Sequence, residues 1–157
     1  MDCFYEQFQT KDYTKIEKIM NTLSKVAIVM AVLFAATLNV FGTVAFILIY
    51  VIIFIISRKL IVEYEYELTE YELSIYKIMN KSKRKEIGSI NIREISSVKT
   101  LDKVSSNTKV VKAYLEESGI KPMVYLTKRA NGLVGFQLAM DEKLLSLIKK
   151  VNPLAFY

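Results

Sequence analysis

The sequence contains no histidine and a single cysteine, Cys3. Without histidine, the chain has no imidazole to act as a general base or as a metal ligand. One cysteine makes neither an intrachain disulfide nor a structural zinc site, so nothing in the sequence requires an oxidising compartment. Because Cys3 does not follow an apolar leader, we interpret it as a spare thiol rather than a lipidation site.

Motifs for enzymatic chemistry are also missing. The 5 glycines form neither a phosphate-binding loop nor a dinucleotide-binding fingerprint. Of the adjacent carboxylates, Glu116 and Glu117 would point to opposite faces of a strand, and Asp141 and Glu142 open a predicted helix. We therefore predict no catalytic residue, no metal site and no cofactor, and we expect that the protein is not an enzyme.

Charge is absent from residues 26–57, a run of 32 residues. As one helix this run would be about 48 Å long, whereas the hydrocarbon core of a bilayer is roughly 30 Å thick. Asn39 and Gly42 suit a tight turn in the middle of the run, and Thr43 can cap a second helix. The sequence therefore predicts a transmembrane helical hairpin over 26–57, rather than one long tilted span or a cleaved signal peptide.

Basic residues flank this run, with Lys25 before it and Arg58 and Lys59 after it. Each arm has about 15 apolar residues, while a span needs roughly 20, so the helices should extend past the run. Lys25, Arg58 and Lys59 would then extend their side chains to the membrane boundary. By the positive-inside rule, we expect a multi-pass protein of the cell membrane with both termini in the cytoplasm.

Residues 1–25 are predicted to form a helical lead at the membrane interface. Phe4 and Phe8, with the nearby Tyr5, recur at helical spacing. The apolar face then continues toward the first span at Ile16, Ile19, Met20 and Leu23. In the alternative interpretation, Phe4, Tyr5 and Phe8 dock onto the soluble domain.

Residues 60–157 are predicted to form one cytoplasmic β domain. From Val62 to Leu68, apolar and aromatic residues alternate with glutamates, which is typical of a half-buried strand. Later strand patterns are centred on 73–78, 87–98, 109–115, 123–128 and 134–140, with a loop over Ser96 to Thr108 and a tight turn at Ala130 to Gly132. Asp141 caps a closing helix that ends near Val151.

The positive charge of the chain is concentrated after the hairpin. Residues 58–157 carry 18 lysines and arginines against 12 acidic residues, whereas residues 1–25 carry four of each. The densest cluster is Lys81, Lys83, Arg84 and Lys85, between two predicted strands. We interpret it either as a solvated hairpin tip or as a contact for anionic lipid headgroups. Nucleic-acid binding is not expected, because the basic residues are scattered over several strands.

Periodicity alone indicates a small antiparallel β domain with one helix. The run from Tyr64 to Val98, together with Asp141 to Pro153, resembles bacterial pleckstrin-homology-like (PH-like) domains that follow a two-helix membrane hairpin. This resemblance covers nearly the whole chain. It implies a membrane α-hairpin plus α+β fold, in which two transmembrane helices precede a PH-like antiparallel β barrel with a C-terminal helix. It implies no catalytic residue.

Two classes of function follow from these patterns. In the first, the chain is a membrane-anchored PH-like binding module at the cytoplasmic face, contacting anionic lipid or a protein partner. In the second, it is an accessory structural subunit of a larger membrane assembly, with the hairpin as the packing surface. Small residues favour helix packing, but they also suit packing of the two arms on each other: Ala31, Ala35, Ala36 and Gly42. We favour the first class.

Overall fold

A computed structural model of the chain describes residues 4–129 and 132–157. Within them the chain divides into two compact units. The β domain comprises residues up to 11 together with 63–78 and 83–157, and the hairpin unit comprises 12–62 with 79–82.

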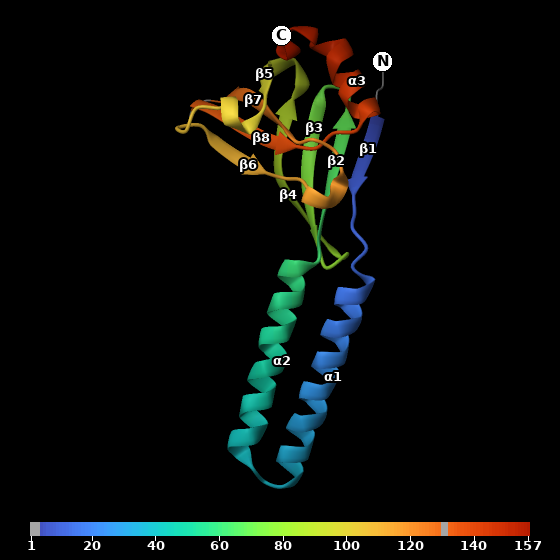
Figure 1. The fold of residues 1–157 in the computed structure, drawn as a ribbon, viewed down its shortest axis with the longest axis vertical. Coiled ribbons are helices and arrows are strands. Elements are labelled where there is room, and N and C mark those ends of the chain that lie inside the picture. Colours follow the sequence, from blue (N-terminus) through green and yellow to red (C-terminus); the bar gives the residue numbers. More distant parts are fainter. Residues whose placement is uncertain (1–3, 130–131) are drawn as a thin grey trace. The chain divides into compact units, whose positions relative to one another are not determined.

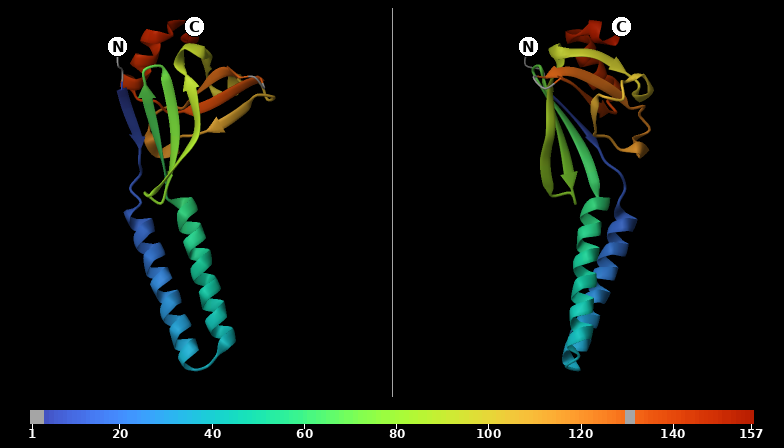
Figure 2. Two further views of the ribbon diagram at one scale, coloured as in Figure 1. Left: turned by 180° about the vertical axis from the view of Figure 1, so that it is seen from behind. Right: turned by 90° about the vertical axis from the view of Figure 1, so that its left-hand side faces the viewer.

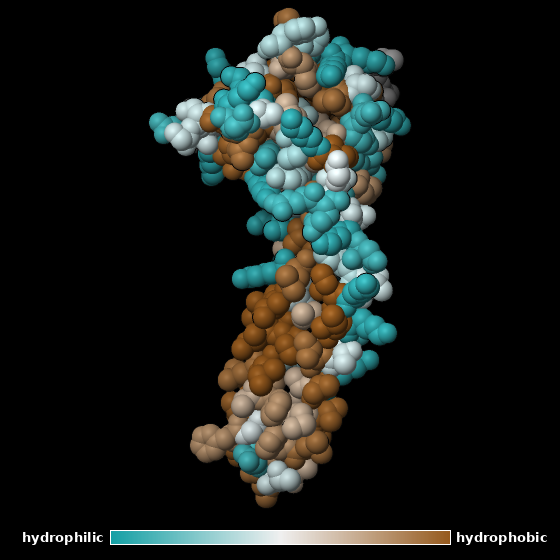
Figure 3. All heavy atoms as spheres, in the orientation of Figure 1, coloured by the Kyte–Doolittle hydropathy of each residue, from teal (hydrophilic) through white to brown (hydrophobic). Residues whose placement is uncertain are grey.

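The hairpin unit contains two antiparallel helices, α1 (Thr14–Ala36) and α2 (Val40–Leu60) (Figure 1). Their 23 and 21 residues correspond to lengths of about 34 and 32 Å. Both helices therefore extend past the uncharged run, as predicted. They are long and apolar enough to span a membrane, and hydrophobic side chains cover most of their visible surface (Figure 3).

The turn between the helices lies where the sequence predicts it, but its geometry differs. The positive φ angle is at Leu38, at 57°, rather than at Asn39 or Gly42. Asn39 caps α2, because its side chain accepts a hydrogen bond of 2.9 Å from the backbone N–H of Gly42. The predicted cap, Thr43, instead donates its hydroxyl to the Asn39 carbonyl at 2.9 Å.

Gly42 allows the two arms to approach each other. A Cβ atom on Gly42 would collide with the ring of Phe34. That ring stacks on Phe46 of the other helix, with 5.4 Å between the ring centroids. Gly42 is therefore used for packing within the hairpin.

The β domain consists of two four-stranded sheets, ordered β1-β2-β3-β4 and β5-β7-β8-β6 (Figures 1 and 2). The first sheet is formed by β1 (Phe4–Gln9), β2 (Val62–Thr69), β3 (Glu72–Met79) and β4 (Lys83–Asn91). The second is formed by β5 (Ile95–Lys99), β6 (Lys109–Lys112), β7 (Met123–Arg129) and β8 (Gly132–Leu138).

The sheets differ from the predicted antiparallel barrel in two respects. The described strands form two separate sheets that do not close into a barrel, and β6 pairs with β8 in parallel. The cause is that β5 and β6 lie at opposite edges of the second sheet, so the chain crosses over between them instead of turning back. The predicted loop is also shorter, because Ser96 to Lys99 belong to β5. In the β7–β8 hairpin, Ala130 and Asn131 lie outside the described residues.

The N-terminal segment is a strand, and the predicted helix at Phe4 to Phe8 is wrong. β1 pairs antiparallel with β2. Gln7 and Gln9 are buried, with 6% and 4% of their surface exposed, whereas Phe4 and Phe8 are exposed. A strand usually shows a hydrophobic residue at every second position. This pattern is absent here because two of the inward positions carry glutamines. The segment does dock onto the β domain, but the side chain that packs against the core is Tyr5.

Buried hydrogen bonds attach β1 to the chain that follows β8. Gln7 Nε2 donates to the Ala139 carbonyl at 3.0 Å, and its Oε1 accepts from the N–H of Asp141 at 2.9 Å. Gln9 also donates to Ala139, and its Oε1 accepts from the N–H of Leu115 at 2.9 Å. Each unpaired group in such a place would cost about 1–3 kcal/mol. Residues before α1 and residues after α2 therefore belong to one folded domain.

The closing helix α3 (Glu142–Val151) is confirmed, and both views of Figure 2 show it at one end of the sheets. Asp141 caps it by accepting a 2.7 Å hydrogen bond from the N–H of Leu144. Leu144 and Ile148 are fully buried in the core. The core also holds Tyr66, whose hydroxyl donates to the carbonyl of Ala113 at 2.6 Å. Burial raises the pKa of Tyr66, so this hydroxyl remains a donor.

Candidate functional site

The predicted basic cluster is divided between two structural settings. Lys81 lies in the β3–β4 turn, residues 80–82, which together with Met79 belongs to the hairpin unit. Lys83, Arg84 and Lys85 begin β4 in the β domain. Asn80 and Lys81 have φ angles of 52° and 54°, as a tight hairpin turn requires. The four basic side chains of the cluster therefore have different surroundings.

The β3–β4 turn is held against the ends of the two helices. The backbone N–H of Asn80 donates a 2.8 Å hydrogen bond to the carbonyl of Ile61, the residue after α2. Lys81 Nζ lies 2.5 Å from Glu17 Oε1 in the first turn of α1. Lys81 thus lies at the end of the hairpin that is opposite its 37–39 turn.

The three predicted membrane-boundary residues are exposed on the helices. Arg58 and Lys59 lie in the last turn of α2, and the guanidinium of Arg58 is 4.3 Å from the ring centroid of Phe54. Lys25 lies deeper, eleven residues after Thr14 at the start of α1. In a bilayer, Lys25 would therefore have to extend its long side chain back toward the helix ends.

Arg84 is engaged by carboxylates on the first sheet. Its Nη2 lies 2.8 Å from Glu65 Oε1 and 2.6 Å from Glu67 Oε2, and its guanidinium lies 3.6 Å from the ring centroid of Tyr76. The side chain of Glu65 is 6% exposed. Desolvation lowers the pKa of Arg84, but the hydrogen bond to Glu67 and the charge of Glu65 outweigh it, so the pKa is raised overall. Arg84 is therefore a counter-ion for Glu65 and Glu67 at the surface of the sheet, with 45% of its side chain exposed.

A third carboxylate lies at the same place. The oxygens of Glu6, Glu65 and Glu67 are within 4.8 Å of one another. Like charges this close repel, and the guanidinium of Arg84 supplies the positive charge that offsets the repulsion. The alternation of glutamates with apolar residues in β2 indicates that the glutamates share a face of the sheet. It does not indicate that Arg84 forms ion pairs with them.

Lys83 and Lys85 are the cations of the cluster that remain available. Both are exposed, and across 4–129 and 132–157 neither side chain has an ion-pair or hydrogen-bond partner. They follow Ser82 by one and three residues, so the chain holds them near the β3–β4 turn.

A second group of basic side chains lies on the second sheet. A hollow of about 700 Å³ is lined by Lys109 of β6 and by Lys128 and Arg129 of β7, together with Glu94. Arg129 donates to the Ser89 carbonyl at 2.6 Å. The sequence does not reveal this group, because its members come from separate strands that the crossover before β6 brings into one sheet.

We predict that Arg84→Gln destabilises the β domain by about 1–3 kcal/mol, because Glu65 would remain buried beside two other carboxylates without a cation. Lys83→Gln, on the neighbouring exposed residue, should change the free energy of unfolding by less than about 0.5 kcal/mol. Denaturant unfolding of the detergent-solubilised chain measures both. Adding Glu65→Gln to Arg84→Gln should restore part of the loss. Equal stability of the two single variants would contradict this role.

Comparison with known proteins identifies the family. A family model described as Bacterial PH-like domain (DUF6106) matches residues 1–157, which include the hairpin and β1. Neither a curated protein nor a solved structure shows a significant match. The resemblance noted in the sequence is thus confirmed, and the chain belongs to the bacterial PH-like domain family.

Proposed function

We propose that this protein is a membrane-anchored binding module whose β domain lies at the cytoplasmic face of the cell membrane. Its ligands are anionic lipid headgroups, contacted through the basic residues that follow the β3–β4 turn. PH-like domains are generally binding modules rather than enzymes. Two helices long and apolar enough to span a bilayer support the anchoring.

The pairing of β1 with β2 is the observation that carries the anchoring proposal. β1 precedes α1, β2 follows α2, and the two strands are neighbours in one sheet. One long span would put these strands on opposite sides of the membrane, where they could not pair. Two spans return the chain to the same side. Arg58 and Lys59 at the returning end favour the cytoplasmic side.

The contacts of the β3–β4 turn support the lipid contact. Asn80 and Lys81 are bonded to the ends of the helices, so with α1 and α2 in the bilayer this turn lies at headgroup level. Lys85 follows Ser82 by three residues, a reach of about 10 Å along a strand. A well-placed Lys or Arg gains about 1 kcal/mol from an anionic leaflet.

The topology is tested by cysteine labelling in a Cys3→Ser background. Phe41→Cys is suitable because Phe41 is 92% exposed, at the hairpin turn. An impermeant maleimide added to intact cells should label Phe41→Cys. It should label Ser105→Cys in the β domain only after the cells are permeabilised. Labelling of Ser105→Cys in intact cells would reverse the proposed orientation.

The lipid contact is tested with the full chain in vesicles. A donor fluorophore on Ser82→Cys, again with Cys3→Ser, reports energy transfer to a trace of fluorescent anionic lipid or of fluorescent zwitterionic lipid. Transfer to the anionic probe should exceed transfer to the zwitterionic one and should decline with salt, since the attraction is screened within about 8–10 Å. Lys83→Gln with Lys85→Gln should remove up to about 2 kcal/mol of this preference.

The matched control is Lys109→Gln with Lys128→Gln, which makes the same charge change on the second sheet. Arg84 stays in place in every variant because it neutralises Glu65. Equal loss from both double variants would mean that only the net charge matters. Equal transfer to both probes in the parent chain would contradict the lipid contact.

A further inference from the structure

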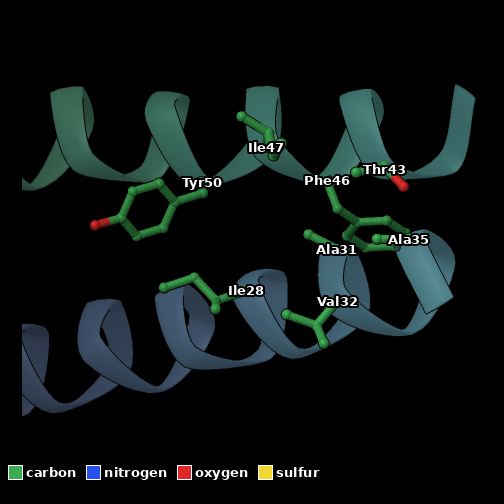
Figure 4. A pocket seen from close by; sticks show the side chains of 8 residues that line it. All are labelled: Ile28, Ala31, Val32, Ala35, Thr43, Phe46, Ile47 and Tyr50. Carbon is green, nitrogen blue, oxygen red and sulfur yellow. The ribbon is translucent and has the colours of Figure 1, made fainter. Parts of the chain in front are cut away.

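A groove runs along the hairpin between α1 and α2 (Figure 4). Its first part is an apolar hollow of about 290 Å³, extending from Ile28 to Ala35 on α1 and from Thr43 to Tyr50 on α2. Ala31 and Ala35 lie in its wall, and their short side chains leave the space between the helices unfilled.

The second part of the groove is more polar than the first. This hollow of about 340 Å³ also contains apolar side chains, and its polar lining comes from Glu17, Asn21, Ser24, Tyr50, Ser57 and Asn80. Tyr50 lines both hollows, so they are successive parts of one groove. Figure 4 shows the Tyr50 hydroxyl pointing away from the Thr43 end of the groove, that is, toward the polar part.

Three polar side chains of this groove have no hydrogen-bond partner on the hairpin. Within the described residues, the side chains of Asn21 and Ser24 and the hydroxyl of Tyr50 make no hydrogen bond. Tyr50 lies midway along α2, ten residues from either end. An unsatisfied polar group in hydrocarbon costs several kcal/mol, so an occupant with oxygen atoms at this depth would be stabilising.

We propose that the groove binds one glycerophospholipid molecule of the cytoplasmic leaflet. Its acyl chain lies along the apolar part, and its ester and headgroup oxygens meet Asn21, Ser24 and Tyr50. This inference rests on the proposed membrane insertion of the hairpin.

The direction of the groove supports this occupant. Its polar end lies at the helix ends that carry Arg58 and Lys59, where headgroups would be, and its apolar end lies toward the 37–39 turn. A lipid of that leaflet has its polar headgroup and its apolar acyl chains in the same order along the membrane normal as the two parts of the groove. A transmembrane helix from a partner would match the groove only if it carried polar side chains at the level of Asn21 and Ser24.

The proposal is tested by native mass spectrometry of the full chain released from nanodiscs that contain phosphatidylglycerol. The parent chain should retain one phospholipid. Ala31→Leu puts a side chain in the space for the acyl chain and should reduce the retained fraction about tenfold, which corresponds to about 1.4 kcal/mol. Tyr50→Phe should also reduce it, because the lipid oxygens lose a donor. Ala45→Leu adds the same atoms to an exposed position of α2 outside the groove and should leave retention unchanged.

Photo-crosslinking of the unmodified chain gives an independent measurement. A phospholipid with a diazirine on its acyl chain should label the Ala31–Ala35 and Thr43–Ile47 surfaces in preference to the rest of the helices. Even labelling around both helices, or equal retention by Ala31→Leu and Ala45→Leu, would overturn the proposal. Membrane insertion is read separately from labelling of Phe41→Cys. A chain that inserts but retains no lipid contradicts the groove alone, whereas a chain that does not insert contradicts the proposed function as well.

Discussion

The antiparallel pairing of β1 with β2 is the constraint on which the rest of the structure depends. It joins residues that precede the hairpin to residues that follow it, in one sheet. Gln7 and Gln9 reinforce the pairing by bonding to the chain around Ala139. Residues 10–13 separate β1 from α1, and residue 61 alone separates α2 from β2, so the connections between the hairpin and the sheet are short in sequence. The two helices therefore return the chain to the sheet from which it left.

This constraint means that the β domain is not a simple C-terminal segment. A fragment starting at residue 60 would lack β1, would expose the edge of β2, and would leave buried groups without partners, among them the N–H of Leu115 and the carbonyl of Ala139. In chain order, the hairpin is thus an insertion between two neighbouring strands of one sheet. β1 is in turn bonded to the chain that enters α3, through Gln7 and Asp141. The proposed anchoring and ligand binding therefore have to be tested on the whole chain.

The sequence predicted those elements whose signal is local. The uncharged run gave the hairpin, and the Asp141 cap with its amphipathic pattern gave α3. β1 was missed because buried glutamines carry no hydrophobic period, and its partner lies more than fifty residues away. Three other features depend on contacts between segments that are distant in the sequence. They are the parallel pairing of β6 with β8, the ion pair between Arg84 and Glu65, and the groove beside Ala31. The residue pattern within one segment does not predict such contacts.

A designed disulfide between β1 and β2 tests this account most directly. Phe4 and Thr69 are cross-strand partners, and both are exposed. Partner Cα atoms in antiparallel strands are about 4.5–5.5 Å apart, a separation that a disulfide spans. In membranes containing the Cys3→Ser chain, Phe4→Cys with Thr69→Cys should oxidise to an intrachain disulfide, whereas Phe4→Cys with Ser105→Cys should stay reduced. If the cysteines introduced at 4 and 69 stay reduced under the same oxidation, β1 does not pair with β2. The segments before and after the hairpin would then not belong to one sheet.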